Sequence, residues 1–349
     1  MRRRILTAVV AGAVLALAAP TAADAAGRPT GIDVSFPQCG TALPPVGDFA
    51  IVGVDDGSAA TPNPCLATEL AWAAGSAGTV HSRVDVYVNT ANPARSAKNS
   101  FLPTGDVTKR GRKVTSPYGH CRNETSRACS WVYGASLAWD DVETSGVTGR
   151  VGRWWLDVES INSWSTSTAR NRAALEGMVA AFTTAKKAVG LYSSAGEFRD
   201  IVGSVPSSSP LSKLPSWIAA GTTQGSAERL CSHVPLTKGR LTLTQWRDTT
   251  AGIDRDVACA VLTKAPKPKI SGRYRVGGKL TAKAGSWGPG SVHLAYRWTR
   301  DGRDIAKATH RTYVLKQADK RHRVAVTVTA TETGYSRSVK KSASHRIAS

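Results

Sequence analysis

The sequence contains little of what metal centres and nucleophilic active sites require. Its 349 residues include 7 histidines and 6 cysteines, with no Cys-x-x-Cys pair and no paired histidine spacing. The sequence therefore predicts no metal site and no cofactor. His81, His120 and His233 show no context of a catalytic triad, and we interpret them as surface or structural residues. Proteases and nucleases are not indicated.

Long apolar runs are absent except at the start of the chain. Three arginines, Arg2–Arg4, precede the apolar stretch Ile5–Ala19 and the small-x-small site Ala23-Asp24-Ala25. This order is typical of a secretion signal, so we expect residues 1–25 to be a signal peptide and the mature chain to start near Ala26. We expect a secreted, extracellular or cell-wall-associated protein with no membrane span. An uncleaved N-terminal anchor is the alternative.

The cysteines are few but even in number, and none follows Cys259. Export places them in an oxidising compartment, which favours three disulfides. Six cysteines allow about 15 connectivities. We favour sequential pairing because it closes short loops. The expected pairs are Cys39–Cys65, Cys121–Cys129 and Cys231–Cys259.

Acidic residues are scarce in the C-terminal part of the chain. From Ala265 to Ser349 there are 19 Lys and Arg against 4 Asp and Glu, a net charge of +15 out of +21 for the whole sequence. Basic segments bind anionic polymers, and outside a bacterial cell these are wall polyanions such as teichoic acids. Export argues against nucleic acid as a partner. A role in solubility alone is the alternative.

A Pro/Lys-rich segment, residues 263–269, divides the chain into two parts. The second part, residues 270–349, has short alternating runs separated by turn residues, and Trp298 lies in the middle of one run. This pattern predicts an all-β sandwich. The expected strands include Lys279–Ala282, Leu294–Trp298, Thr312–Leu315 and Val324–Val328. With Gly285-x-Trp287, Tyr296-x-Trp298 and Asp301-Gly302, this part resembles the Ig-like modules of secreted actinobacterial proteins.

The first part, residues 26–262, alternates apolar strands with helix-like stretches, which predicts an α/β barrel. The expected strands are Gly31–Ser35, Phe49–Val54, Val84–Asn89, Trp154–Glu159, Val189–Ser193, Ser216–Ala219, Leu241–Trp246 and one near Gly252–Val257. Apolar residues at helical spacing predict a helix over Ala169–Lys187. The connection Asn92–Ser130 is long enough to be functional, and we expect Cys121–Cys129 to fix it.

One strand, Trp154-Trp155-Leu156-Asp157-Val158-Glu159, ends in two carboxylates. Residues i and i+2 of a strand share a face, so Asp157 and Glu159 should project side by side. Neighbouring carboxylates resist ionising together, and one of them can keep its proton and act as an acid. Breaking a glycosidic bond requires such a pair. Asp33, in Gly31–Ser35, can supply a third carboxylate.

Several motifs follow one another in an order that is known from a hydrolase family. They are Gly31-Ile32-Asp33-Val34-Ser35, Phe49-Ala50-Ile51-Val52-Gly53, Leu156-Asp157-Val158-Glu159, Gly190-Leu191-Tyr192-Ser193, Trp217 with Ala219, Gln245-Trp246, and Ile253-Asp254 with Asp256. Across almost all of residues 31–258 this order resembles glycoside hydrolase family 25, the lysozyme-like muramidases that cut peptidoglycan.

The resemblance implies a barrel whose catalytic groups lie at the C-terminal ends of the strands. Glu159 matches the general acid/base, and Asp157 matches the carboxylate that orients the acetamido group of the substrate as that group attacks. Asp33 matches a further acid beside the sugar, and Asp254 or Asp256 matches a late aspartate. Further substrate-binding candidates are Tyr87, Tyr192, Gln245 and Trp246. The alternative for each carboxylate is a buried structural acid.

The sequence departs from the family pattern at three places. They are Phe36-Pro37-Gln38-Cys39, Val54-Asp55-Asp56-Gly57 and Tyr87-Val88-Asn89. The leading hypothesis is a monomeric, secreted glycosidase that acts on peptidoglycan or a related wall glycan. Two alternatives stay open: a non-catalytic wall-binding barrel, and a glycosidase for another polysaccharide.

Overall fold

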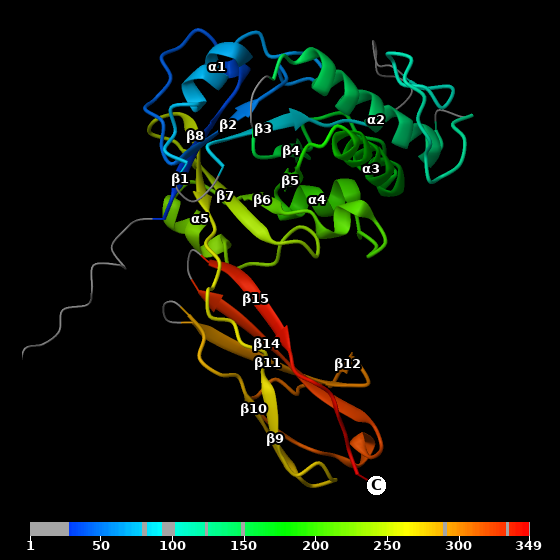
Figure 1. Cartoon of the computed structure of the whole chain (residues 1–349), viewed down its shortest axis with the longest axis vertical. Coiled ribbons are helices and arrows are strands. Elements are labelled where there is room, and N and C mark those ends of the chain that lie inside the picture. Colours follow the sequence, from blue (N-terminus) through cyan, green and yellow to red (C-terminus); the bar gives the residue numbers. More distant parts are fainter. Residues whose placement is uncertain are drawn as a thin grey trace, which may run out of the picture.

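A computed structural model of the chain shows a closed eight-stranded barrel followed by an all-β region (Figure 1). The structure describes residues 28–78, 82–92, 102–122, 125–147, 151–288, 292–332 and 335–348. The predicted signal peptide and His81 lie outside these residues. Within the described ranges, no helix combines the length and apolar character needed to cross a membrane. The predicted fold class, a barrel followed by an all-β part, is confirmed.

The barrel strands follow their order in the sequence around the closed sheet. They are β1 (Thr30–Val34), β2 (Phe49–Gly53), β3 (Val84–Asn89), β4 (Trp154–Asp157), β5 (Val189–Ser193), β6 (Ser216–Ala219), β7 (Leu241–Asp248) and β8 (Ile253–Ala258). Neighbours from β1 to β7 are parallel, whereas β8 runs antiparallel to both β7 and β1. The parallel strands are nearly continuous apolar runs because both of their faces are buried.

Helices cover the outside of the barrel (Figure 1). They are α1 (Leu66–Ala73), α2 (Arg127–Thr144), α3 (Thr168–Thr184), α4 (Ala195–Val202) and α5 (Gln224–Leu230). The predicted helix Ala169–Lys187 corresponds to α3. Helix α2 was not predicted. It packs closely against α3, since a Cβ atom at Gly134 would lie 1.8 Å from the carbonyl oxygen of Ala174.

The adjacent tryptophans of β4 face opposite sides of the barrel wall. Trp155 is fully buried in the barrel interior, where it packs with Trp217 and Phe49. Trp154 packs outward against Phe182 of α3, with ring centroids 5.0 Å apart. Both rings are therefore part of the core, as expected for alternating residues of a strand.

The all-β region consists of two sheets that enclose a separate core. One sheet holds β9 (Lys269–Gly272), β10 (Lys279–Lys283) and β13 (Thr312–Val314). The other holds β11 (His293–Arg300), β12 (Arg303–Asp304), β14 (Arg323–Glu332), β15 (Tyr335–Lys341) and β16 (His345–Arg346). Trp298, in the middle of β11, is fully buried between the sheets. The Ig-like assignment stays a prediction.

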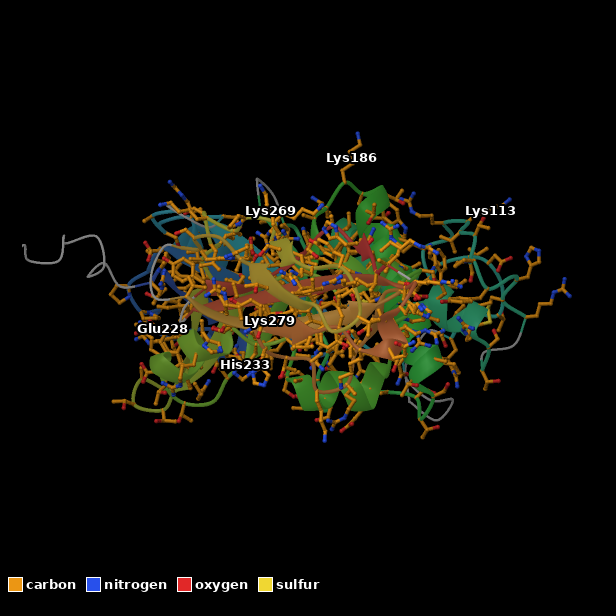
Figure 2. The ribbon with its side chains drawn as sticks, turned by 90° about the horizontal axis from the view of Figure 1, so that it is seen from below. Lys113, Lys186, Glu228, His233, Lys269 and Lys279 are labelled. Atoms are coloured by element: carbon orange, nitrogen blue, oxygen red, sulfur yellow. A yellow bond between two sulfur atoms is a disulfide. The ribbon has the colours of Figure 1, made fainter. Side chains whose placement is uncertain are left out.

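The all-β region contacts the barrel at the end where β7 begins. The backbone N–H of Ser336 donates to Ala260 O at 2.7 Å, and its hydroxyl donates to Leu241 O at 2.5 Å. The guanidinium of Arg28 lies 4.0 Å from the ring centroid of Tyr335. Figure 2 views the molecule from the end of the all-β region. The C-terminal ends of the parallel barrel strands lie at the opposite end of the barrel.

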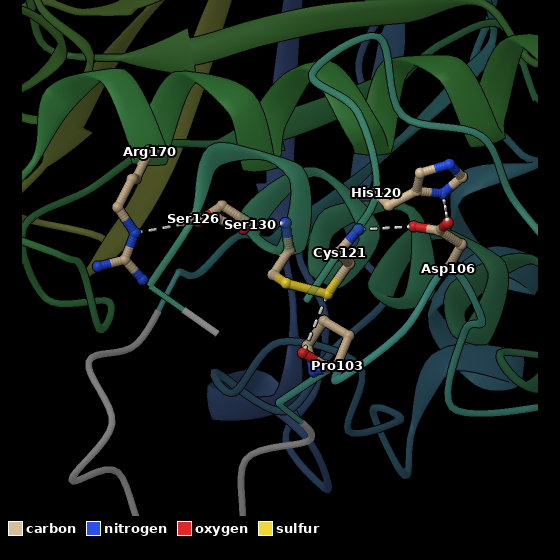
Figure 3. Close-up of a disulfide and its surroundings, with 8 residues drawn as sticks. Pro103, Asp106, His120, Cys121, Ser126, Ser130 and Arg170 are labelled. Atoms are coloured by element: carbon tan, nitrogen blue, oxygen red, sulfur yellow. Dashed lines mark hydrogen bonds and ion pairs between the residues drawn. A yellow bond between two sulfur atoms is a disulfide. The ribbon is translucent and has the colours of Figure 1, made fainter. Parts of the chain in front are cut away.

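Three disulfides join the cysteines in the predicted sequential pairs, Cys39–Cys65, Cys121–Cys129 and Cys231–Cys259. Figure 3 shows that Cys121–Cys129 ties the described part of the long connection to the first turn of α2. The backbone N–H of Cys121 donates to Asp106 Oδ1 at 2.8 Å. His120 contacts the same carboxylate, its Nδ1 lying 2.5 Å from Asp106 Oδ2, which agrees with a structural role.

Candidate active site

A cleft of about 520 Å³ opens at the C-terminal ends of the parallel strands. This is the end at which barrels of this kind carry their chemistry. The cleft is lined by Asp33, Val34, Ser35, Phe36, Pro37, Gln38, Asp56, Gly57, Ser58, Tyr87, Asn89, Asp157, Glu159, Ile161, Arg247 and Asp254. Four of the carboxylates suggested by the sequence therefore meet in one place, namely Asp33, Asp157, Glu159 and Asp254.

Asp157 lies at the end of β4, beside Asn89 of β3. The Asn89 side chain donates from Nδ2 to Asp157 Oδ2 at 2.8 Å, and the carboxyls of Asp157 and Glu159 lie within hydrogen-bond reach of each other. Burial raises the pKa of Asp157 well above its usual range, and the nearby carboxyl of Glu159 raises it further. Asp157 and Glu159 together therefore keep a proton to higher pH than two isolated carboxylates would.

Glu159 follows β4 and is half-buried in the cleft wall. Its backbone carbonyl accepts a hydrogen bond of 2.8 Å from Trp164 Nε1, so this tryptophan anchors the loop after β4. Burial raises the pKa of Glu159, the charge of Glu197 on α4 raises it further, and the Tyr192 hydroxyl opposes the shift. A carboxyl that stays protonated towards neutral pH can act as a general acid.

Asp33 is held by a chain of two hydrogen bonds that starts at β5. Tyr192 donates its hydroxyl to Gln245 Oε1 at 2.7 Å, and Gln245 Nε2 donates to Asp33 Oδ2 at 3.0 Å. Burial and then the charge of Asp254 raise the pKa of Asp33 to about 7, against the effect of the Gln245 hydrogen bond. Tyr192 and Gln245 thus position this acid from beside the cleft.

The two late aspartates occupy different positions on β8. Asp254 lines the cleft, and its Oδ2 forms an ion pair with Nη1 of Arg247 at 2.8 Å. Asp256 is fully buried and not among the cleft-lining residues, and burial raises its pKa well above the usual range. Of these two, Asp254 is therefore the one positioned to meet a substrate.

The remaining candidates are divided by the alternation of side chains along the strands. Tyr87 lines the cleft. Trp246 lies on the opposite face of β7 from Gln245, and it packs with Ile218 and Val257 outside the cleft. The expectation that Trp246 contacts substrate is not supported by this placement. Within the described chain, no group of three or more His, Cys, Asp and Glu residues could hold a metal ion.

Other cleft residues were not singled out from the sequence. Arg247 lies two residues after Gln245 on the same face of β7, so strand alternation could have identified it. Phe36 and Ile161 line the cleft with 40% and 87% of their surface exposed. Exposed apolar side chains at a cleft can pack against the C–H faces of a sugar ring.

A buried acidic pair lies behind Asn89. Asp55 accepts a hydrogen bond of 2.7 Å from the backbone N–H of Asn89, and Asp141 of α2 lies beside Asp55. The carboxyls of Asp55 and Asp141 lie within hydrogen-bond reach of each other, so the pair can share a proton. Burial, and then the charge of Asp55, raise the pKa of Asp141 well above its usual range.

We expect Asp141→Asn to stabilise the protein by about 1–3 kcal/mol at neutral pH, since Asn carries no charge that burial beside Asp55 would penalise. Because the folded-state pKa of Asp141 is raised, its cost appears as pH rises above about 3.9, where the unfolded carboxyl ionises. Melting temperatures measured from pH 3 upwards test this. If Asp141→Asn raises the melting temperature more at acidic pH than at neutral pH, ionisation of Asp141 is not what costs the wild type stability.

One comparison with known proteins gives a match that includes residues of the candidate site. The family model named lysozyme-like protein 1 matches residues 137–230, which include Asp157, Glu159 and Glu197. No curated protein matches the chain significantly.

Among solved structures, the chain is similar to three lysozymes at low identity. A muramidase from Trichobolus zukalii is 17% identical, with a TM-score of 0.43, covering 66% of this chain and 92% of that one. A family GH25 lysozyme from Aspergillus fumigatus is 15% identical, with a TM-score of 0.44, covering 66% and 94%. A bacterial lysozyme from Streptomyces coelicolor is 15% identical, with a TM-score of 0.38, covering 67% and 93%.

The family-model match covers the part of the barrel that contributes both Asp157 and Glu159. It confirms the lysozyme-like resemblance predicted from the sequence and supports a glycosidase.

Proposed function

We propose that the protein is a secreted glycosidase that cleaves peptidoglycan or a related wall glycan in the manner of a muramidase. The convergence of Asp33, Asp157, Glu159 and Asp254 in one cleft carries this proposal. A carboxyl with a raised pKa beside a second carboxyl is the arrangement that glycosidic cleavage requires. The three disulfides agree with an exported protein.

In this mechanism Glu159 supplies the proton and the substrate supplies the nucleophile. The carbonyl oxygen of the 2-acetamido group attacks the anomeric carbon as the glycosidic C–O bond breaks and Glu159 protonates the leaving oxygen. The ionised Glu159 then takes a proton from water, which attacks the anomeric carbon and releases the acetamido oxygen. The product keeps the configuration of the substrate, and no protein nucleophile is needed.

Asp157 would orient the acetamido group by accepting a hydrogen bond from the N–H of that group. The Asn89 hydrogen bond to Oδ2 fixes the Asp157 carboxyl beside Glu159. Preorganised groups of this kind stabilise charge at low reorganisation cost. Asp33 and Asp254 would bind the sugar from the β1 and β8 side of the cleft.

The test is to incubate the purified, oxidised protein with peptidoglycan sacculi and to measure new reducing ends. We expect the protein to release reducing ends from intact sacculi. We expect no release from sacculi whose acetamido groups have been removed, because these groups supply the nucleophile. If the protein sediments with sacculi without releasing reducing ends, it is a wall-binding barrel. If it neither cleaves nor sediments, wall glycan is not its substrate.

Glu197 on α4 should control the pH range of the reaction. Its carboxylate accepts from the backbone N–H and the hydroxyl of Ser160, at 2.9 and 2.5 Å, directly after Glu159. Its charge raises the pKa of Glu159. Since Glu159 must be protonated to act as an acid, activity falls as pH rises through this pKa.

We therefore expect Glu197→Gln to lower the pKa of Glu159 and to move the alkaline limb of the pH–kcat/KM profile to lower pH. Asp200→Asn is the matched control, because Asp200 lies on the same helix and is exposed, paired with Arg199. If the alkaline limb of the Glu197→Gln profile stays in place or moves to higher pH, Glu197 does not favour the protonated form of Glu159.

A further inference from the structure

One stretch of the chain contains no acidic residue at all. From Val257 to Arg300, both included, there are nine Lys and Arg and no Asp or Glu. The stretch supplies β9, β10 and β11 of the all-β region. Its positive charge is therefore not neutralised by acids of the same strands.

The three-stranded sheet sorts its side chains into a buried face and an exposed face. Ile270, Leu280 and Ala282 are buried in the core between the two sheets. The alternate residues Lys269, Lys279 and Lys283 are exposed, and Lys269 lies directly opposite Lys283 in the β9–β10 register. Figure 2, viewed from this end of the molecule, labels Lys269 and Lys279.

Like charges directly opposite each other in an antiparallel pair destabilise it. The acids of the all-β region with described side chains are engaged elsewhere. Asp301 contacts His322, Asp304 lies 3.8 Å from Arg297, and Asp319 is buried against Arg300. The Lys269–Lys283 pair thus repels itself without a compensating acid from β9, β10 or β13, and an external anion would relieve this repulsion.

Hydroxyl groups lie between the lysines on the same face. Ser271 pairs with Thr281, and Thr281 pairs with Thr312, so three hydroxyls cross the middle of the sheet. All three are partly exposed. Lys279, Thr281 and Lys283 repeat every second residue, with a spacing of about 6.8 Å along β10. A repeating row of donors suits a linear polymer with regularly spaced anions better than a compact ligand.

We propose that the exposed face of β9, β10 and β13, formed by Lys269, Lys279, Lys283, Ser271, Thr281 and Thr312, binds a linear phosphodiester polymer of the bacterial wall. The lysines neutralise the phosphates, and the hydroxyls donate hydrogen bonds to phosphate oxygens. The contacts with the barrel involve β15 and the start of β7, so this face is separate from the cleft. The wall polymer can then hold the protein while the cleft stays open.

The test uses poly(glycerol phosphate) as the probe and calorimetric titration of the full chain at low and at physiological salt. We expect the triple variant Lys269→Gln, Lys279→Gln, Lys283→Gln to bind roughly 100-fold more weakly, since each Lys at an anionic surface contributes about five-fold. The control variant Arg303→Gln, Lys307→Gln, Lys340→Gln removes the same charge from exposed positions outside β9, β10 and β13. It should bind within about three-fold of the wild type.

Equal losses in the two triple variants would overturn the proposal, because net charge alone would then explain binding. Binding to vesicles of phosphatidylglycerol but not to the polymer would also overturn it and indicate a lipid surface instead. Melting curves of both variants confirm that they fold. Since the readout is binding and not hydrolysis, the result is independent of whether Glu159 is catalytic.

Discussion

Replacing Glu159 by Gln is expected to lower the rate of glycan cleavage by about 10²–10⁴-fold, the usual contribution of a general acid/base. Gln has the same shape but carries no transferable proton. The half-buried position of Glu159 accepts a neutral group, since burial already raises the pKa of this carboxyl. We therefore expect the melting temperature of the variant to be at least that of the wild type. Single-turnover rates of reducing-end release measure the loss.

Glu228→Gln is the matched control for this substitution. Glu228 lies on α5, is absent from the cleft lining, and accepts a hydrogen bond from Gln224 one turn away. Its variant should cleave at the wild-type rate. Hydrolysis by Glu159→Gln at more than about a tenth of the wild-type rate would remove Glu159 from the mechanism.

Replacing Gly134 by Ala is expected to destabilise the barrel by about 3 kcal/mol, at the upper end of the cost of overpacking. The added Cβ atom would lie 1.8 Å from a backbone oxygen of α3, so no flexible side chain can move aside and the two helices must separate. The helix propensity of Ala offsets about 1 kcal/mol of a larger steric cost. We expect the melting temperature of the barrel transition to fall by about 6–12 °C.

Gly196→Ala separates this packing effect from helix propensity. Gly196 lies in α4, and a Cβ atom there meets nothing within 4 Å. This variant should be as stable as the wild type or slightly more stable. If calorimetry shows the same change in melting temperature for Gly134→Ala and Gly196→Ala, the close packing of α2 against α3 does not explain the glycine at position 134.

The strands of the barrel could be predicted from the sequence because parallel strands buried on both faces are uninterrupted apolar runs. The expected bounds Val84–Asn89, Val189–Ser193 and Ser216–Ala219 coincide with β3, β5 and β6. Helix α2 was missed for the converse reason. Polar or small residues such as Ser130 and Ser136 lie at its buried positions, so it lacks the one-sided apolar pattern on which helix prediction depends.

The site was predictable where its residues are close in the sequence. Strand alternation places Asp157 and Glu159 together, and the structure agrees. The partners Asn89 and Glu197 come from other strands and helices, and only barrel closure brings them to the pair. The family motif predicts that Trp246 binds substrate, whereas alternation with the inward-facing Gln245 directs Trp246 outward.

The proposed function requires that the cleft cleaves wall glycan at muramic acid. The most direct measurement is to digest sacculi, reduce the new ends with borohydride, and identify the reduced sugars by mass spectrometry. We predict N-acetylmuramitol ends that appear with the wild type and the Glu228→Gln control, and not with Glu159→Gln. N-acetylglucosaminitol ends alone, or no new ends with the wild type, would contradict the claim.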